Sequence, residues 1–130
     1  MIELTNVVKT YDTGTRALNG VSLKIEDGEF VFLVGPSGSG KSTIAKLMAG
    51  FWDATGGTVS FGGQDIQNIP FDQLMGEISY VAQDNFLFDC PLKENIRLGR
   101  PGASDEEVFA AARAAQCEEF IGRLEHGWDT

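Results

Sequence analysis

The spacing of hydrophobic residues changes character near residue 91. Several earlier segments have the β-branched or alternating pattern of strands, and the later chain has the spacing of amphipathic helices. The predicted strands are residues 2–11, 17–25, 29–34, 56–66 and 77–84. A helix is predicted over residues 41–50, where Ile44, Leu47 and Met48 recur at helical spacing before Gly50. This order of strands and helices predicts an α/β fold.

The segment 17–35 has the pattern of an antiparallel hairpin. Val21, Leu23 and Ile25 alternate with polar residues, and the dipeptide Asp27-Gly28 predicts a turn. The second arm, residues 29–34, is almost continuously apolar, as a strand in a sheet covered on both faces must be. We therefore expect residues 29–34 to be a buried strand.

Two helices are expected after residue 91. Pro91 occupies a plausible first helical position in "PLKENIRLG", and Gly99 marks the end of that helix. Ser104 is followed three residues later by Glu107, the spacing of a capping box that opens the helical segment 104–124.

Composition narrows the class of protein. The 130 residues suffice for one domain or a piece of one, and 42% of them are hydrophobic. The net charge of −9 argues against nucleic acid as a partner, because phosphate backbones select basic surfaces. No apolar run approaches the roughly 18 residues of a membrane span. Cys90 and Cys117 lie in no metal-binding spacing and are expected to be reduced thiols.

Residues 35–43, "GPSGSGKST", fit the phosphate-binding pattern G-x-x-x-x-G-K-[ST] at every fixed position. Glycines let successive backbone N–H groups point inward at phosphate oxygens, while a lysine adds a mobile charge and a serine hydroxyl can ligate Mg²⁺. The helix that starts at Lys41 directs its positive end at the same anion. The residues expected to bind a nucleoside triphosphate are Gly35, Ser37, Gly38, Ser39, Gly40, Lys41, Ser42 and Thr43.

Two other interpretations of this stretch are weaker. A flexible Gly/Ser linker would not be framed by "VFLV" and "TIAKL". A dinucleotide-binding fingerprint fails at Thr43, where a glycine or alanine belongs, and no acidic residue closes a strand about 20 residues later.

The flanking residues resemble an ATP-binding domain of the ABC (ATP-binding cassette) superfamily. Tyr11 stands where that family has an aromatic residue stacking on adenine, and Gln83 matches its glutamine that contacts Mg²⁺ and the attacking water. Residues 1–43 resemble stand-alone ATPases of the FtsE type, and residues 44–130 resemble exporter-type domains. One sequence with both characters suggests either a recombined or engineered chimera or a natural member of the family.

The resemblance implies a particular organisation. Residues 1–90 would form an antiparallel β subdomain and part of a P-loop (RecA-like) core, and residues 91–130 would begin the helical subdomain. The family's signature sequence LSGGQ, its Walker B strand, the catalytic glutamate and the switch histidine have no match in the chain. We therefore expect the N-terminal portion of an ATPase, in which Lys41 and Gln83 assist a reaction whose catalytic set is incomplete.

The expected function follows from the family. The parent protein would couple ATP binding and hydrolysis to membrane transport, using ATP and Mg²⁺, with Ser42 and Gln83 as metal ligands. Its partners would be a second ATP-binding domain and a transmembrane subunit, at the cytoplasmic face of the membrane. The alternatives are a module that binds nucleotide without turnover, and a chain without a working site that self-associates through unpaired sheet edges.

Overall fold

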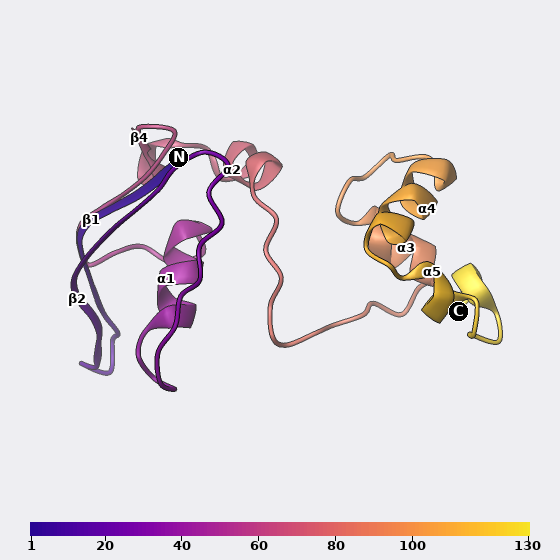
Figure 1. Ribbon diagram of the computed structural model, residues 1–130, viewed down its shortest axis with the longest axis horizontal. Helices are drawn as coiled ribbons and strands as arrows, with labels where there is room; N and C mark the ends of the chain where they lie inside the picture. The colour runs from indigo at the N-terminus through magenta and orange to yellow at the C-terminus, as the bar shows by residue number, and fades with distance from the viewer. The chain divides into compact units, whose positions relative to one another are not determined.

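The computed structural model describes all 130 residues as two compact units, Met1–Val81 and Ala82–Thr130 (Figure 1). The first unit holds a β-sheet and two helices, and the second unit is helical. None of the helices has the length and hydrophobicity needed to cross a membrane. The expected boundary between functional subdomains, at residue 90, stays a prediction.

The first unit is organised by a four-stranded antiparallel sheet in the order β2-β1-β3-β4. Its strands are β1 (Ile2–Thr10), β2 (Arg16–Ile25), β3 (Gly56–Phe61) and β4 (Gln64–Asp65). Ile2 is paired with Ile25 on one side and with Phe61 on the other. The predicted strands at 2–11 and 17–25 are confirmed, and the predicted strand at 56–66 is a short hairpin turning at Gly62 and Gly63.

A bulge in β1 determines which of its side chains are buried. Leu4 and Val7 are three residues apart, a spacing that places side chains on opposite faces of a regular strand. Both are nevertheless buried in the same cluster, because Asn6 adopts a left-handed φ of 49° and shifts the register. Across the bulge, a Cβ on Gly57 would lie only 2.3 Å from the Asn6 carbonyl oxygen. Gly57 therefore allows the two backbones to approach closely.

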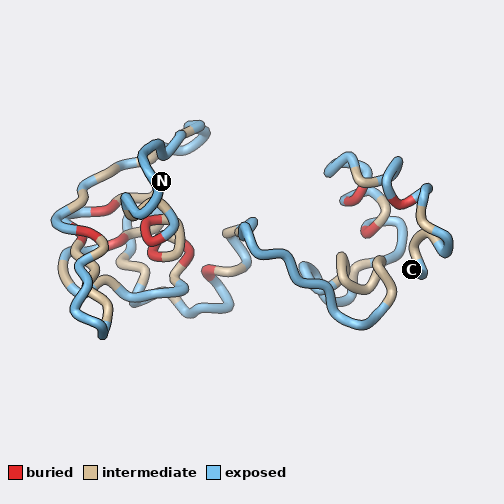
Figure 2. The backbone as a smooth tube through the Cα atoms, turned by 90° about the horizontal axis from the view of Figure 1, so that it is seen from below, coloured by how far each residue is buried: buried red, intermediate tan, exposed pale blue.

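Helix α1 (Lys41–Met48) packs on this sheet and supplies the other half of the core. Figure 2 shows the buried positions of the first unit gathered where helix and sheet meet. The core cluster consists of Leu4, Val7, Leu18, Ile44, Leu47 and Val59. The chain leaves α1 at Gly50, whose φ of 71° is the left-handed conformation expected after a helix C-terminus. The predicted helix over 41–50 is therefore confirmed.

Two predicted strands are absent. Residues 29–34 and 78–84 have no strand structure, so β2 pairs with β1 and not with residues 29–34. The turn at Asp27-Gly28 does form, since Glu29 N donates to Glu26 O at 3.2 Å, but no ladder follows it. A strand is stabilised by hydrogen bonds to a neighbour, and neither apolar segment has one in this chain. Consequently Phe30, Phe32 and Val34 are between 77% and 87% exposed.

A short helical connection closes the first unit. The 3-10 turn η1 (Ile66–Asn68) is capped by the Asp65 carboxylate, which accepts from Gln67 N at 3.0 Å. Helix α2 (Phe71–Glu77) buries Leu74 beside Gly50, where a Cβ would come within 2.6 Å of Leu74 Cδ2. Helix α2 extends to Glu77, the first residue of the strand predicted over 77–84.

The second unit contains α3 (Leu92–Arg97), α4 (Asp105–Ala114), α5 (Glu118–Ile121) and the 3-10 turn η2 (Gly127–Asp129). The predicted capping box of α4 is confirmed: Ser104 N donates to Glu107 Oε2 at 2.8 Å, and Glu107 N donates to Ser104 Oγ at 3.3 Å. Pro91 is the N-cap of α3 and not its first helical residue. The helical segment predicted over 104–124 is divided at Gln116, whose φ is 61°.

Long-range contacts hold the second unit together. Leu92 N donates to Thr130 O at 2.9 Å, and the rings of Phe109 and Trp128 pack at a centroid distance of 4.3 Å. Arg97 pairs with both Glu94 and Asp105, and thereby connects α3 to the start of α4. Cys90 and Cys117 are both free thiols.

Candidate functional site

The glycine-rich loop lies between the extended segment 29–34 and α1. Gly38 and Gly40 have φ angles of 80° and 92°, which L side chains adopt at a cost. Gly40 also packs against β2, because a Cβ there would lie 2.7 Å from Leu18 Cδ2 and 3.0 Å from Ala17 O. A Cβ on Gly38 would meet no atom within 4 Å. The C-terminal end of the loop is therefore seated on the sheet, while its middle projects freely.

The ammonium group of Lys41 lies inside this loop. Its Nζ donates to Gly35 O and Pro36 O, both at 2.7 Å, and to Ser39 Oγ at 3.2 Å. These three acceptors use the full donor capacity of a lysine side chain. All three are neutral, so no carboxylate competes with an incoming anion for Lys41.

The first turn of α1 offers backbone donors to the same loop. The N-cap, Gly40, supplies no side-chain cap, and the first turn contains no acidic residue. The leading N–H groups of a helix have no acceptor within the helix, and together they carry the positive end of its dipole. Ser42 is exposed at this end, and Thr43 is 6% exposed. An uncapped helix start next to a lysine is the local chemistry of a phosphate site.

Tyr11 and Thr43 meet at the side of the loop. The Tyr11 hydroxyl lies 2.8 Å from Thr43 Oγ1, so the end of β1 and the first turn of α1 share a hydrogen bond. The Tyr11 ring also packs edge to face against Trp52, with centroids 5.5 Å apart. Lys46 Nζ lies 4.4 Å from the centroid of the Trp52 ring, a cation–π distance. Both the ring and the hydroxyl of Tyr11 are therefore held in place.

The sequence did not identify Trp52 as part of this cluster. Residues 50–53 read as the end of a helix followed by a loop, and an aromatic residue there is unremarkable. Trp52 lines a hollow together with Tyr11, with Lys9 and Thr10 at the end of β1, and with Asp12 in the turn that follows.

Gln83 belongs to the second unit, in the exposed segment between Ala82 and Cys90. The structure thus brings Tyr11 together with the phosphate loop and α1 in one unit, and Gln83 lies outside that unit. A shared Mg²⁺ site of Ser42 and Gln83 stays a prediction.

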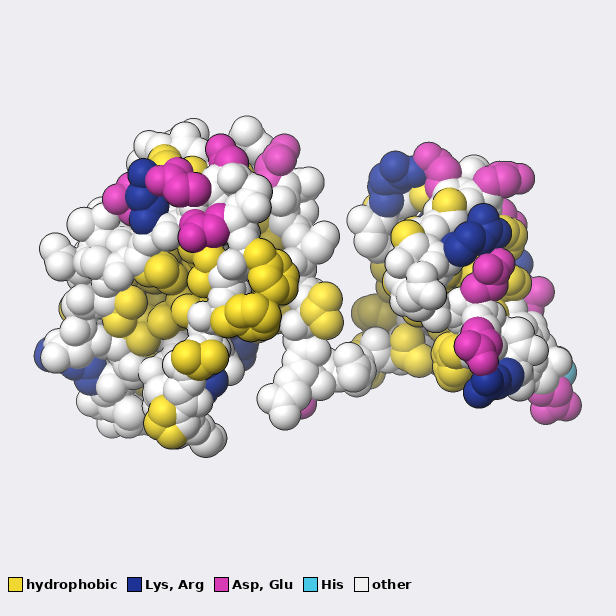
Figure 3. Space-filling model, in the orientation of Figure 1, with side chains coloured by type: hydrophobic (Ala, Val, Ile, Leu, Met, Phe, Trp, Pro, Cys, Tyr) yellow, Lys and Arg dark blue, Asp and Glu magenta, His cyan; other side chains and the backbone are white.

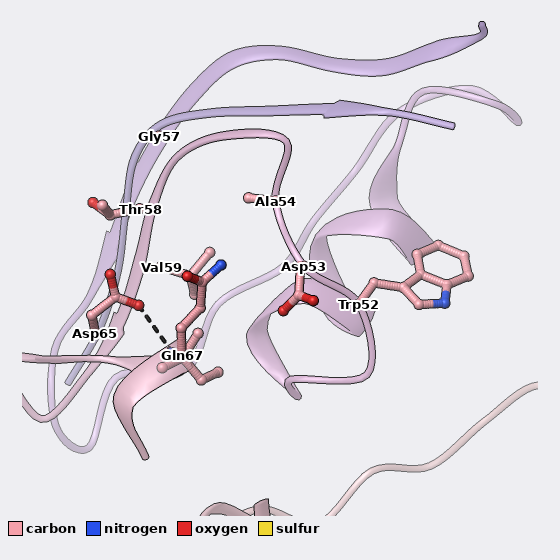
Figure 4. Close-up of a pocket in the computed structure, with 9 residues that line it drawn as sticks. Trp52, Asp53, Ala54, Gly57, Thr58, Val59, Asp65 and Gln67 are labelled. Carbon is pink, nitrogen blue, oxygen red and sulfur yellow. Dashed lines mark hydrogen bonds between the residues drawn. The ribbon is translucent and has the colours of Figure 1, made fainter. Parts of the chain in front are cut away.

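A second cavity in the first unit is too small for a nucleotide. Figure 4 shows it between β3 and the loop at Asp53, with the Trp52 ring on the side away from Asp65. Its volume of about 30 Å³ matches the space of roughly one water molecule. Asp65, on its wall, is already engaged in capping η1.

A sequence model of a known family, described as "ABC transporter", matches residues 18–127 and therefore most of the chain. The chain belongs to the ABC transporter family. Within that family it corresponds to part of the ATP-binding domain, so the α/β class with an N-terminal antiparallel sheet is confirmed.

Individual ABC transporter relatives align over almost the whole chain. An uncharacterised ABC transporter ATP-binding protein of Bacillus subtilis, YknV, is 45% identical over 99% of this chain and 21% of its own length. An ATM1-type heavy metal exporter of Novosphingobium aromaticivorans is 44% identical over 96% of this chain and 21% of its own length. The chain thus spans about one fifth of the relatives it matches.

A solved structure of a bacterial Atm1-family ABC exporter with ATP bound resembles the chain with a TM-score of 0.93 at 43% identity. The match covers 99% of this chain and 23% of the exporter chain. One ABC transporter chain therefore contains counterparts of both the sheet unit and the helical unit.

Proposed function

We propose that the first unit binds Mg-ATP at the glycine-rich loop. The observation that carries this proposal is the uncapped N-terminus of α1 with the Lys41 ammonium beside it, surrounded by neutral acceptors. Exchanging the neutral carbonyl acceptors for phosphate oxygens would pair the charged Lys41 ammonium with charged acceptors, and hydrogen bonds between two ionised groups are among the strongest in proteins. Because the chain as a whole is acidic, this local geometry must provide the attraction for the anion.

Each residue of the site has an assigned role in this proposal. Lys41 and the backbone N–H groups of residues 38–43 hold the phosphates, and the Tyr11 ring stacks on the base. Ser42, together with Gln83, would ligate Mg²⁺, which neutralises phosphate charge when it is bound. Stacking depends little on the identity of the base, so GTP should bind only modestly more weakly than ATP.

At the level of the whole protein, we propose an exporter-type ATPase that couples ATP binding and hydrolysis to transport. Support comes from the exporters among the relatives, which extend well beyond the matched fifth. The partners would be a second ATP-binding domain and a transmembrane part, and the site would face the cytoplasm at the membrane. Within residues 1–130, Lys41 and Gln83 lack a general base, so this chain alone should bind nucleotide with little turnover.

Titration calorimetry and fluorescent analogues of ATP and GTP test the site. We expect Lys41→Ala to lose far more affinity than Tyr11→Ala, whose stacking is worth about 1–3 kcal/mol. Lys24→Ala is the matched control, because it removes the same charge from a lysine that lies on β2 and pairs with Glu26. If Lys41→Ala binds like the Lys24→Ala control, the phosphate site is not where we place it.

A phosphate-release assay distinguishes the two functional alternatives. Turnover by residues 1–130 above a Lys41→Ala control would contradict a module that only binds nucleotide. A rate equal to that control, with binding retained, would support it.

A further inference from the structure

One hydrogen bond connects the two ends of the proposed nucleotide site. The Tyr11 hydroxyl lies 2.8 Å from Thr43 Oγ1, and these residues are 32 positions apart in the chain. In the proposed site Tyr11 stacks on the base, while Thr43 is in the first turn of α1, the helix whose N-terminus faces the phosphates. A ring that only stacked on a base would not need its hydroxyl at this position.

The Tyr11 side chain is fixed on several sides. Its backbone closes a turn, with Tyr11 N donating to Thr15 O at 2.9 Å and Gly14 N donating to Tyr11 O at 2.8 Å. Its ring is packed at 85° to the Trp52 ring. The hydroxyl therefore reaches Thr43 from a constrained position, so little side-chain entropy is lost when it acts there.

The chemistry of the two hydroxyl groups favours one direction for this hydrogen bond. A phenol is a stronger acid than an aliphatic alcohol, so the better pairing has Tyr11 donating and Thr43 accepting. The Thr43 hydroxyl hydrogen is then available for another acceptor. Thr43 is 6% exposed and lies in the first turn of α1, so a phosphate bound at that end of the helix would offer its hydroxyl a charged acceptor. Successive hydroxyl groups in such a chain polarise and strengthen one another.

We propose that Tyr11 is a positioning residue for phosphate as well as a stacking residue for the base. Its hydroxyl orients the Thr43 hydroxyl so that the Thr43 hydrogen points to a phosphate oxygen. This inference rests on the proposed function, because it needs the phosphate to occupy the glycine-rich loop. It differs from that proposal in giving the aromatic residue an effect on ligands that have no base.

Inorganic tripolyphosphate with Mg²⁺ is the deciding ligand, because it has phosphates but nothing on which Tyr11 can stack. We expect Tyr11→Phe to bind tripolyphosphate about three- to tenfold more weakly than wild type, the range for loss of one hydrogen bond. Tyr11→Ala should lose the same amount for tripolyphosphate and considerably more for ATP. Tyr80→Phe is the matched control, because it removes a tyrosine hydroxyl that makes no hydrogen bond to the loop.

A double-mutant cycle separates positioning from a general structural effect. If the two hydroxyl groups act as a chain, Tyr11→Phe should have little further effect on tripolyphosphate binding in a Thr43→Val background. Thr43→Ser, which keeps the hydroxyl, should restore sensitivity to Tyr11→Phe. Equal losses from Tyr11→Phe in the wild-type and Thr43→Val backgrounds would overturn the inference.

The controls also separate this inference from the proposed function. Loss of tripolyphosphate binding in Lys41→Ala, with Tyr11→Phe binding like wild type, would overturn the positioning role and leave the phosphate site intact. Binding that does not depend on Lys41, or no binding by the wild-type chain, would overturn both.

Discussion

Replacing Gly40 with alanine should destabilise the first unit through two separable effects. The φ of 92° costs an L residue about 1–2 kcal/mol. The new Cβ would also lie 2.7 Å from Leu18 Cδ2 and 3.0 Å from Ala17 O. Leu18 is 4% exposed and packed in the core, and overpacking such a position costs about 1–3 kcal/mol. We therefore expect Gly40→Ala to lower the free energy of unfolding by about 2–5 kcal/mol.

Gly38→Ala provides the matched control. Its φ of 80° carries the same conformational cost, but its Cβ would meet no atom within 4 Å. The difference between the two variants, about 1–3 kcal/mol, therefore measures the contact with β2 alone. Urea unfolding of both variants in a Trp128→Phe background would follow the first unit, because Trp52 is then the remaining tryptophan.

Shortening Leu18 supplies a further check on this reasoning. Leu18→Ala makes room for the Cβ, so it should be less destabilising in the Gly40→Ala background than in the wild-type background. Equal unfolding free energies for Gly40→Ala and Gly38→Ala would refute the conclusion that the sheet seats the phosphate loop.

Two further predictions concern acid stability and association. The hydrogen bond from Ser104 N and the neighbouring Arg100 hold the pKa of Glu107 below its usual value of 4.5, so the stability that Glu107 contributes is complete above that pH and is lost as the pH falls through the lowered pKa. A Glu107→Gln variant should therefore lose less stability over that acid range than the wild type. An unchanged loss of stability in acid would contradict this. The exposed pair Phe30 and Phe32 should promote self-association, so Phe32→Ser should lower the mass measured by light scattering at high concentration. Replacing Leu98, which is exposed in the other unit, with serine is the control. An equal fall in mass for that variant would show that the association is not specific to residues 29–34.

The sequence predicted the helix cap and the turn correctly, but it did not predict which strands pair with one another. The capping box at Ser104 and Glu107 and the turn at Asp27-Gly28 depend on residues within four positions of one another, so their side chains are sufficient to specify them. The apolar segment 29–34 also has the right residues for a strand, but a strand exists only when another strand pairs with it. Sequence pattern reports the capacity to pair and says nothing of whether a partner is present.

The bulge in β1 shows a second reason why the sequence pattern alone did not predict the fold. Simple alternation assigns Leu4 and Val7 to opposite faces, whereas the left-handed conformation of Asn6 brings both into the core. Asparagine adopts this conformation more readily than most residues, and Gly57 on the facing strand accommodates the approach. The two residues that make the bulge possible are 51 positions apart, and neither signals it without the other.

The candidate site likewise contains residues that are neighbours in the sequence and residues that only the fold brings together. Lys41, Ser39 and the glycines are neighbours in sequence, so the motif predicts both their identity and their proximity. The cluster of Tyr11, Thr43 and Trp52 depends on β1 and α1 packing on one sheet, so only the family resemblance indicated Tyr11, and nothing indicated Trp52.

Hydrophobic side chains gather on one face of the first unit (Figure 3). The two ends of the phosphate loop differ in how firmly the rest of the unit holds them. The C-terminal end of the loop is fixed twice, by the contact of Gly40 with β2 and by burial of Ile44 and Leu47 in the core. Its N-terminal end continues into residues 29–34, which pair with no strand. Lys41 partly compensates, because its bonds to Gly35 O and Pro36 O join the free end of the loop to the fixed end. A phosphate that draws Lys41 away from those carbonyls removes that connection, so part of the binding free energy must order the loop. Pairing residues 29–34 with a neighbouring strand would supply that order in advance and strengthen binding without adding any contact to the nucleotide.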